Sequence, residues 1–264
     1  MLRGALPLLA LSLAIACLLP AVPAATVAPP GVSHPHGPDG APDSHSDGAY
    51  DIPVWFNWPI TTLDVVVVPP LHGQLNNGNG LLGGLDPLEA TPLNTYLRAT
   101  VDGIRDWQGA IQMFGSPWLR STVQLRLYVL GVDVVPADVR PEVVVVADET
   151  KGPILGWAWS TYPCLVDNSM AYLTTSFTYA DMYNVNGQEF GHCLGLNHVR
   201  GGHPTHDVMN GAYPHGIGDP ATKLHCISNL DVAGLELVFD GYAGDASLPV
   251  SQWRTTRWTP GCEL

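Results

Sequence analysis

The spacing of apolar positions changes along this chain of 264 residues, and it predicts where helices and strands lie. Nearly unbroken apolar runs at 63–68 and 143–147 are typical of strands buried on both faces. Residues 123–130 alternate between apolar and polar side chains, as a strand with one covered face does. From 93 to 107 the apolar residues recur every three or four positions, which predicts an amphipathic helix. Two shorter strands are expected at 54–56 and 170–173.

The order of these elements indicates the class of fold. Strand, strand, helix, strand, strand, short strand and helix follow one another from residue 52 onward. This order predicts a mixed sheet that is covered by helices. A loop rich in glycine and asparagine is expected at 73–84. We therefore expect one domain over 51–264.

The first 24 residues are interpreted as a secretory signal peptide. Arg3 supplies the positive start, an apolar run covers 5–19, and small residues at 22–24 stand where a signal peptidase cuts. The run is short for a membrane span, and no second run of about 18 apolar residues follows it. We expect a secreted protein, and a lipoprotein anchor on Cys17 is the less favoured alternative.

The net charge of the chain excludes one class of binding partner. The formal net charge is −13, and lysine occurs only at Lys151 and Lys223. So few cations cannot form the basic surface that DNA or RNA binding needs, so we expect no nucleic-acid partner. Residues 25–50 are rich in Pro, Gly, Ala, Ser and Asp without periodicity, which predicts a disordered arm. We expect the domain that follows the arm to be a monomer.

The cysteine count agrees with export. After Cys17 leaves with the signal peptide, four cysteines remain: Cys164, Cys193, Cys226 and Cys262. An even set in an oxidising compartment predicts two disulfides. The count alone leaves three pairings open.

One segment carries a pattern with chemical meaning, and it reads Gln188-Glu189-Phe190-Gly191-His192-Cys193-Leu194-Gly195-Leu196-Asn197-His198. On a helix, Gln188 and His192 project from the same face, and Glu189 lies one step round it. Gly195 can take a left-handed conformation that ends the helix and turns the chain back. That turn would bring His198 to the same point in space.

Such a centre suits a zinc ion. Zinc takes nitrogen and oxygen ligands in a tetrahedron and leaves its fourth position to water, whose pKa falls to about 7. Glu189 would be the general base and later the acid that protonates the leaving amine. The pattern E-x-x-H-x-x-G-x-x-H arises by chance in roughly one such chain per thousand, so coincidence explains it poorly. We expect Zn2+ as the cofactor, with Gln188, His192 and His198 as its ligands.

The segment resembles the signature of the metzincin zinc endopeptidases of the matrixin and adamalysin kinds, H-E-x-x-H-x-x-G-x-x-H followed by a methionine turn. Asp207-Val208-Met209-Asn210 stands where that turn would be. The resemblance implies that Met209 forms the floor of the metal site without binding the metal. The likeness covers roughly residues 52–264 and is strongest over 184–210.

The resemblance also implies a fold and a substrate. The fold is α+β: a mixed, mostly parallel twisted sheet with an antiparallel edge strand, an active-site helix, and a small C-terminal subdomain with the methionine turn. Residues 155–158 resemble the strand entry of that sheet, and 168–176 resemble its edge strand, which in the family binds extended peptide by strand addition. The stretch 228–231 resembles the start of the family's last helix. The partner would be a protein or peptide substrate.

The chain departs from the family signature at its first histidine, which is Gln188 here. A glutamine oxygen can bind zinc but is a weaker donor than imidazole, so the site either works with lower affinity or is an inactive relic. The retained Glu189 favours a working site. A third alternative recruits a substitute histidine from the loop that follows the motif: His203, His206 or His215.

Two local expectations complete the prediction. Asn186-Gly187 reads as a turn, so either the core overrides this tendency or the helix begins later than is usual in the family. By the same resemblance, Cys164 would pair with Cys262, which leaves Cys193 to pair with Cys226. The sequence therefore predicts a secreted zinc-dependent endopeptidase. The alternative is a catalytically weak or inactive metzincin-like protein that binds zinc or a peptide strand.

Overall fold

The computed structural model describes residues 49–70, 92–148, 156–169, 177–200, 207–210, 224–242 and 244–255. All of them belong to one unit of the chain, Val32–Leu264. The predicted signal peptide at 1–24, the predicted arm as far as residue 48 and the predicted loop at 73–84 lie outside these ranges.

Five strands form the central sheet: β2 (Thr62–Val67), β3 (Gln124–Val129), β4 (Val143–Asp148), β5 (Gly156–Trp159) and β6 (Cys164–Ser169). Their order across the sheet is β3-β2-β4-β6-β5. The first four in this order are parallel, and β5 runs antiparallel to β6 at one edge. The predicted α+β fold, with a mostly parallel sheet and an antiparallel edge strand, is confirmed.

The parallel neighbours β2 and β3 need a crossover connection. Within the described residues it consists of α2 (Pro92–Phe114) and α3 (Pro117–Thr122). α2 confirms the helix expected from the three- and four-residue spacing, and Tyr96, Ile104 and Trp107 bury its apolar face. α3 was not predicted, because its 6 residues are too few to show a periodicity.

The identity of the edge strand differs from the prediction. The edge strand expected at 168–176 is instead β5, because β6 lies between β4 and β5. Asn168 and Ser169 end β6, while 170–176, and with them the short strand predicted at 170–173, lie outside the described residues. Asp167 and Asn168 are buried although they are polar, which hid a central strand from a prediction based on apolar patterns.

A second, two-stranded sheet pairs β1 (Ala49–Pro53) with β7 (Asp245–Pro249) in antiparallel register. The strand expected at 54–56 is wrong in position, since β1 ends at Pro53 and Val54 keeps only an isolated bridge to Leu196. β1 also begins before the expected domain boundary at residue 51. A short 3-10 turn, η1 (Val250–Gln252), follows β7.

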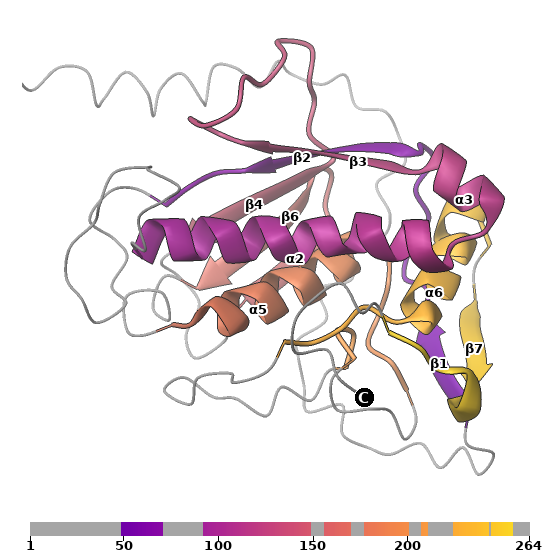
Figure 1. Cartoon of the computed structure of the whole chain (residues 1–264). Helices are drawn as coiled ribbons and strands as arrows, with labels where there is room; N and C mark the ends of the chain where they lie inside the picture. Colours follow the sequence, from indigo (N-terminus) through magenta and orange to yellow (C-terminus); the bar gives the residue numbers. More distant parts are fainter. Residues whose placement is uncertain are drawn as a thin grey trace, which may run out of the picture. The chain divides into compact units, whose positions relative to one another are not determined.

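Helix α6 (Asn229–Asp240) packs against β1 and β7 (Figure 1). It begins with a capping box: the Ser228 side chain accepts from the Asp231 N–H, and the Asp231 carboxyl accepts from the Ser228 N–H. The helix expected after residue 228 is therefore confirmed. No helix within the described ranges is long and apolar enough to cross a membrane.

Helices α2 and α5 (Tyr179–Cys193) lie side by side against one face of the sheet (Figure 1). The two backbones approach closely at Gly103, where an added Cβ would lie 2.7 Å from the Tyr183 carbonyl oxygen. The Trp107 indole N–H donates to the carbonyl oxygen of Gly187 at 2.8 Å. These contacts explain why α5 continues through Asn186 and Gly187: tertiary packing overrides the local tendency to turn.

Candidate metal centre

Helix α5 carries three of the predicted site residues. It starts at a capping box in which the Thr178 side chain accepts from the Asp181 N–H and the Asp181 carboxyl accepts from the Thr178 N–H. Gln188, Glu189 and His192 stand in its second half, and all three are buried. Burying so many polar groups on one helix is costly unless each has a bonding partner or a function.

The chain reverses direction directly after α5. Gly195 has a φ of 103°, which confirms the left-handed conformation predicted for it. An added Cβ at Gly195 would lie 2.6 Å from the Phe56 carbonyl oxygen, so space as well as backbone conformation requires glycine here. The Leu196 N–H then donates to the carbonyl oxygen of Gly191 at 3.1 Å, which holds the returning chain against the helix.

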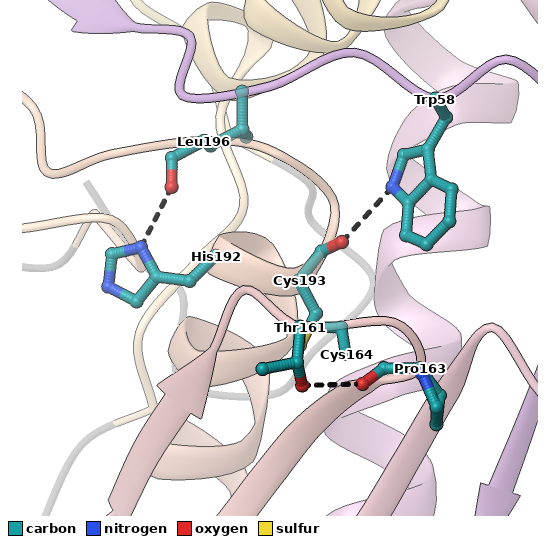
Figure 2. Close-up of a disulfide and its surroundings, with 7 residues drawn as sticks. All are labelled: Trp58, Thr161, Pro163, Cys164, His192, Cys193 and Leu196. Carbon is teal, nitrogen blue, oxygen red and sulfur yellow. Dashed lines mark hydrogen bonds between the residues drawn. A yellow bond between two sulfur atoms is a disulfide. The ribbon is translucent and has the colours of Figure 1, made fainter. Parts of the chain in front are cut away.

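This reversal brings two histidines together. The Nε2 atoms of His192 and His198 lie 3.1 Å apart. His192 Nδ1 lies 2.8 Å from the Leu196 carbonyl oxygen. Figure 2 marks this hydrogen bond with a dashed line. A carbonyl oxygen only accepts hydrogen bonds, so Nδ1 carries the proton and Nε2 of the neutral ring keeps its lone pair.

The spacing of the two nitrogens fits a shared zinc ion. Two nitrogens that bind one zinc ion at about 2.0–2.1 Å lie roughly 3.3 Å apart in a tetrahedral site, close to the separation found here. The hydrogen bond from Nδ1 to a backbone carbonyl is also the usual way in which a protein orients a histidine ligand. These two residues therefore fit the role predicted for them.

Gln188 lies one turn before His192 on the same helix. Its amide Nε2 donates to the carbonyl oxygen of Asn210 at 3.0 Å. This bond uses the nitrogen side of the amide and leaves Oε1 as the atom that could bind a metal. Coordination by Gln188 remains a prediction, now with a defined orientation of the side chain.

Glu189 is the buried acid of the site, with a relative exposure of 4%. Burial raises its pKa to about 8, and a hydrogen bond from the Ala158 backbone N–H lowers it in part. Its Oε2 atom is buried without a hydrogen-bond partner among the described residues. A divalent cation close to the carboxyl group would favour its ionised form.

The edge strand β5 shapes the surroundings of Glu189. Gly156 faces α5 so closely that an added Cβ would clash with Val185 and lie 3.2 Å from Cγ of Glu189. Ala158, on the same strand, supplies the N–H that binds the carboxyl group. Pattern reasoning could not find this contact, because a backbone donor has no signature in the sequence.

Met209 lies under α5, where an added Cβ on Gly191 would clash with its sulfur. The turn that carries it is tight: the Met209 N–H donates to Oδ1 of Asp207 at 3.0 Å, and the Asn210 N–H donates to the Asp207 carbonyl oxygen at 3.1 Å. The Val199 N–H also donates to the Met209 carbonyl oxygen at 3.0 Å. This turn therefore contacts both the helix and the strand-like segment that follows His198.

The disulfide pairing differs from the prediction. Cys164 at the start of β6 is bonded to Cys193 at the end of α5 (Figure 2). Cys226 is also disulfide-bonded. Neither Cys164–Cys262 nor Cys193–Cys226 is therefore present. The physical reason is that the sheet places the first residue of β6 beside the last turn of α5, with 5.6 Å between the two Cα atoms.

The disulfide lies directly beside the candidate metal centre, because Cys193 follows His192. The Trp58 indole N–H donates to the Cys193 carbonyl oxygen at 3.1 Å, which adds a second attachment for the end of α5 (Figure 2). Tying this end of the helix to the sheet restricts how far His192 can move.

The substitute ligands considered for position 188, namely His203, His206 and His215, lie outside the described residues. Within the described ranges, no group of three or more His, Cys, Asp and Glu side chains could hold a metal ion. The candidate centre has two histidines, and its third expected ligand is an amide. Comparison with known proteins adds no assignment: no protein-family profile matches the chain, and no curated protein is significantly similar to it.

Proposed function

We propose that this protein is a secreted, zinc-dependent endopeptidase of the metzincin kind. The observation that carries the proposal is the convergence of His192 Nε2 and His198 Nε2 to 3.1 Å beside a buried acid. The antiparallel edge strand next to that acid and the contact of Met209 with α5 at Gly191 support it further. The signature residues, which resemble those of the metzincins, supply the link to peptide hydrolysis.

His192, His198 and the amide oxygen of Gln188 would hold the zinc ion, which supplies a Lewis acid that polarises a peptide carbonyl and acidifies water. Glu189 would accept a proton from the attacking water and pass it to the departing amine. The Ala158 N–H fixes one side of that carboxyl group. The other oxygen, Oε2, has no partner among the described residues and is the atom suited to move the proton.

The substrate would be an extended peptide. β5 is the last strand of the central sheet, and a peptide can add to such an edge through backbone hydrogen bonds. Because Ala158 on β5 also contacts Glu189, a peptide bound along this strand would pass close to the general base. The signal peptide predicted at the N-terminus and the disulfides support a location outside the cytoplasm.

The alternative is a metzincin-like protein that binds zinc or a peptide strand without hydrolysing it. The amide at position 188 favours this alternative, since an amide oxygen is a weaker zinc donor than imidazole. The endopeptidase and the zinc-binding form of the alternative share a metal centre and differ in turnover.

The test combines metal analysis with hydrolysis of a quenched fluorescent peptide library by the oxidised protein. We expect about one zinc per chain, and hydrolysis that chelator abolishes and added zinc restores. His192→Ala and His198→Ala should lose the metal, as should Gln188→Leu, whereas alanine variants of His203, His206 and His215 serve as matched controls that keep it. Zinc without turnover would establish the alternative. A protein without stoichiometric zinc would contradict the endopeptidase and the zinc-binding form of the alternative, and would leave only binding of a peptide strand. Metal loss in one of the control variants would move the third ligand away from Gln188.

A further inference from the structure

The segment that precedes the central sheet pairs with the chain that carries His198. Residues 51–55 run antiparallel to 195–200, although about 140 residues separate them in the sequence. Four backbone hydrogen bonds join the two segments: Asp51 N–H to Arg200 O at 3.2 Å, Arg200 N–H to Asp51 O at 2.7 Å, Asn197 N–H to Pro53 O at 2.9 Å, and Trp55 N–H to Gly195 O at 2.7 Å. The loop between the two histidines is thereby held by a distant part of the chain.

The same segment places an aromatic ring against a predicted metal ligand. The rings of Trp55 and His192 are stacked, with centroids 4.9 Å apart and an angle of 18° between their planes. The Leu196 carbonyl oxygen restrains the His192 ring within its plane, through Nδ1. The stacked indole restrains it in the perpendicular direction. Together, the two contacts fix the direction in which Nε2 points toward His198.

We propose that Trp55 is a positioning residue for metal binding: its ring holds His192 in the orientation that binds the metal. Residues 51–55 hold the segment that carries His198 in place. The inference rests on the proposed function, because it assumes that His192 binds zinc. A ligand held in its binding orientation loses less conformational freedom when the metal arrives, which strengthens binding. Removing the stack should therefore weaken zinc binding while the ligands themselves remain.

The experiment compares three replacements of Trp55 in the full oxidised chain. Trp55→Ala removes the ring, Trp55→Leu keeps apolar bulk without a ring, and Trp55→Phe keeps a ring that can stack. Trp118 on α3, with 40% exposure, supplies the matched control Trp118→Ala. Zinc affinity is measured by competition with a chromogenic chelator, and the thermal midpoint after chelator treatment shows whether each variant folds.

We expect Trp55→Ala and Trp55→Leu to bind zinc about tenfold more weakly, the lower end of the effect usual for groups that orient metal ligands. Trp55→Phe should restore the affinity, and Trp118→Ala should leave it unchanged. A merely structural role would lower the thermal midpoint without this difference between Leu and Phe. Since Trp55→Leu preserves apolar bulk, the test does not depend on whether Trp55→Ala folds.

Cobalt provides a spectroscopic check. Co2+ bound by His192 should quench the fluorescence of Trp55, so Trp55→Phe should lose part of the quenching that Trp118→Phe retains. If the wild-type protein binds zinc but Trp55→Leu binds it equally well, the positioning role is wrong and the proposed function stands. If the wild-type protein binds neither zinc nor cobalt, the proposed function and the positioning role fail together.

Discussion

The two halves of α5 are equally buried, yet they treat their polar side chains differently. In the first half, Asn184 Oδ1 accepts from the His225 N–H at 2.7 Å, and Asn186 Nδ2 donates to Thr100 Oγ1 at 3.1 Å. Asn186 Oδ1 also accepts from Asn168 Nδ2 at 2.9 Å. These side chains form a hydrogen-bonded network that attaches the helix to its neighbours.

The second half of α5 carries the residues of the candidate metal centre. Glu189 Oε2 lacks a hydrogen-bond partner among the described residues, and the ring nitrogens of His192 and His198 face each other. An unpartnered buried carboxyl oxygen destabilises the fold, and a ligand bound beside Glu189 would offset that cost. The comparison thus separates side chains that bond to neighbouring elements from side chains for which a function is proposed, on one helix.

The largest effect should come from Glu189→Gln. Glutamine can still accept from the Ala158 N–H but cannot take up a proton, so peptide hydrolysis should fall by about 10²–10⁴-fold. The thermal midpoint of the metal-free protein should change little, since a carboxyl group that is mostly protonated at pH 7 is replaced by a neutral amide of the same shape. Turnover of a quenched peptide and a melting curve check both halves of the expectation. Unchanged turnover would remove Glu189 from the proposed chemistry.

The opposite result is expected for Asn186→Ala in the first half of α5. The change leaves Thr100 without the donor that Asn186 Nδ2 provides and should destabilise the protein by about 1–3 kcal/mol. Zinc affinity of the folded fraction should not change. Urea unfolding measures the loss, and Gln112→Ala, which removes an exposed amide from α2, is the control with a change below about 0.5 kcal/mol. A lower zinc affinity in Asn186→Ala would show that the first half of α5 also contributes to the metal centre, and would contradict the comparison.

Asp231 can be compared directly with Glu189, because it is a second fully buried carboxyl group whose pKa is raised. Burial raises the pKa of Asp231 well above its ordinary value, and the neighbouring Asp207 carboxylate raises it further. Asp207 accepts from the Met209 N–H and from the Trp253 indole N–H, so Asp231 is the one of the two acids that keeps the proton. Asp231 therefore has a structural role at the start of α6, whereas a catalytic role is proposed for Glu189.

The proton on Asp231 determines how the stability of the fold changes with pH. The folded chain holds it more tightly than the unfolded chain, so its stabilising effect is complete below about pH 3.9 and is lost as the pH rises toward the folded pKa. In that window stability should fall by up to about 1.4 kcal/mol per pH unit. Asp231→Asn cannot ionise and keeps an oxygen for the Ser228 N–H, so it should abolish this slope in urea titrations. Asp207→Asn, which loses a hydrogen-bond acceptor, should instead destabilise the protein. Equal slopes of stability against pH in the wild type and in Asp231→Asn would contradict the proton on Asp231.

The smallest effect concerns Gln188, the ligand that departs from the family signature. In Gln188→His, one ring nitrogen can donate to the Asn210 carbonyl oxygen and the other can bind the metal. Zinc retention during dialysis against chelator should improve about tenfold, which corresponds to about 1.4 kcal/mol. If this variant loses metal faster than the wild type, position 188 is not a ligand.

Local patterns predicted what depends on neighbours in the chain. The apolar runs of β2 and β4 and the periodicity of α2 concern residues within a few positions of one another. The reversal at Gly195 is equally local, because a glycine after the last turn of a helix can take a positive φ wherever the helix lies. For this reason the meeting of His192 with His198 could be predicted from the motif alone.

Tertiary structure decided the contacts between distant segments. The Cys164–Cys193 bond, the edge position of β5, the contact of Ala158 with Glu189 and the stacking of Trp55 on His192 depend on which strands become neighbours. Packing against α2 also carried α5 through Asn186 and Gly187, against their tendency to turn. The sequence by itself therefore determined the long helices, the strands β2, β3 and β4 of the central sheet, and the motif that brings two imidazoles together. The partners that orient those groups followed only from the fold, because pairing energies between residues far apart in the chain leave no periodic signal in the sequence.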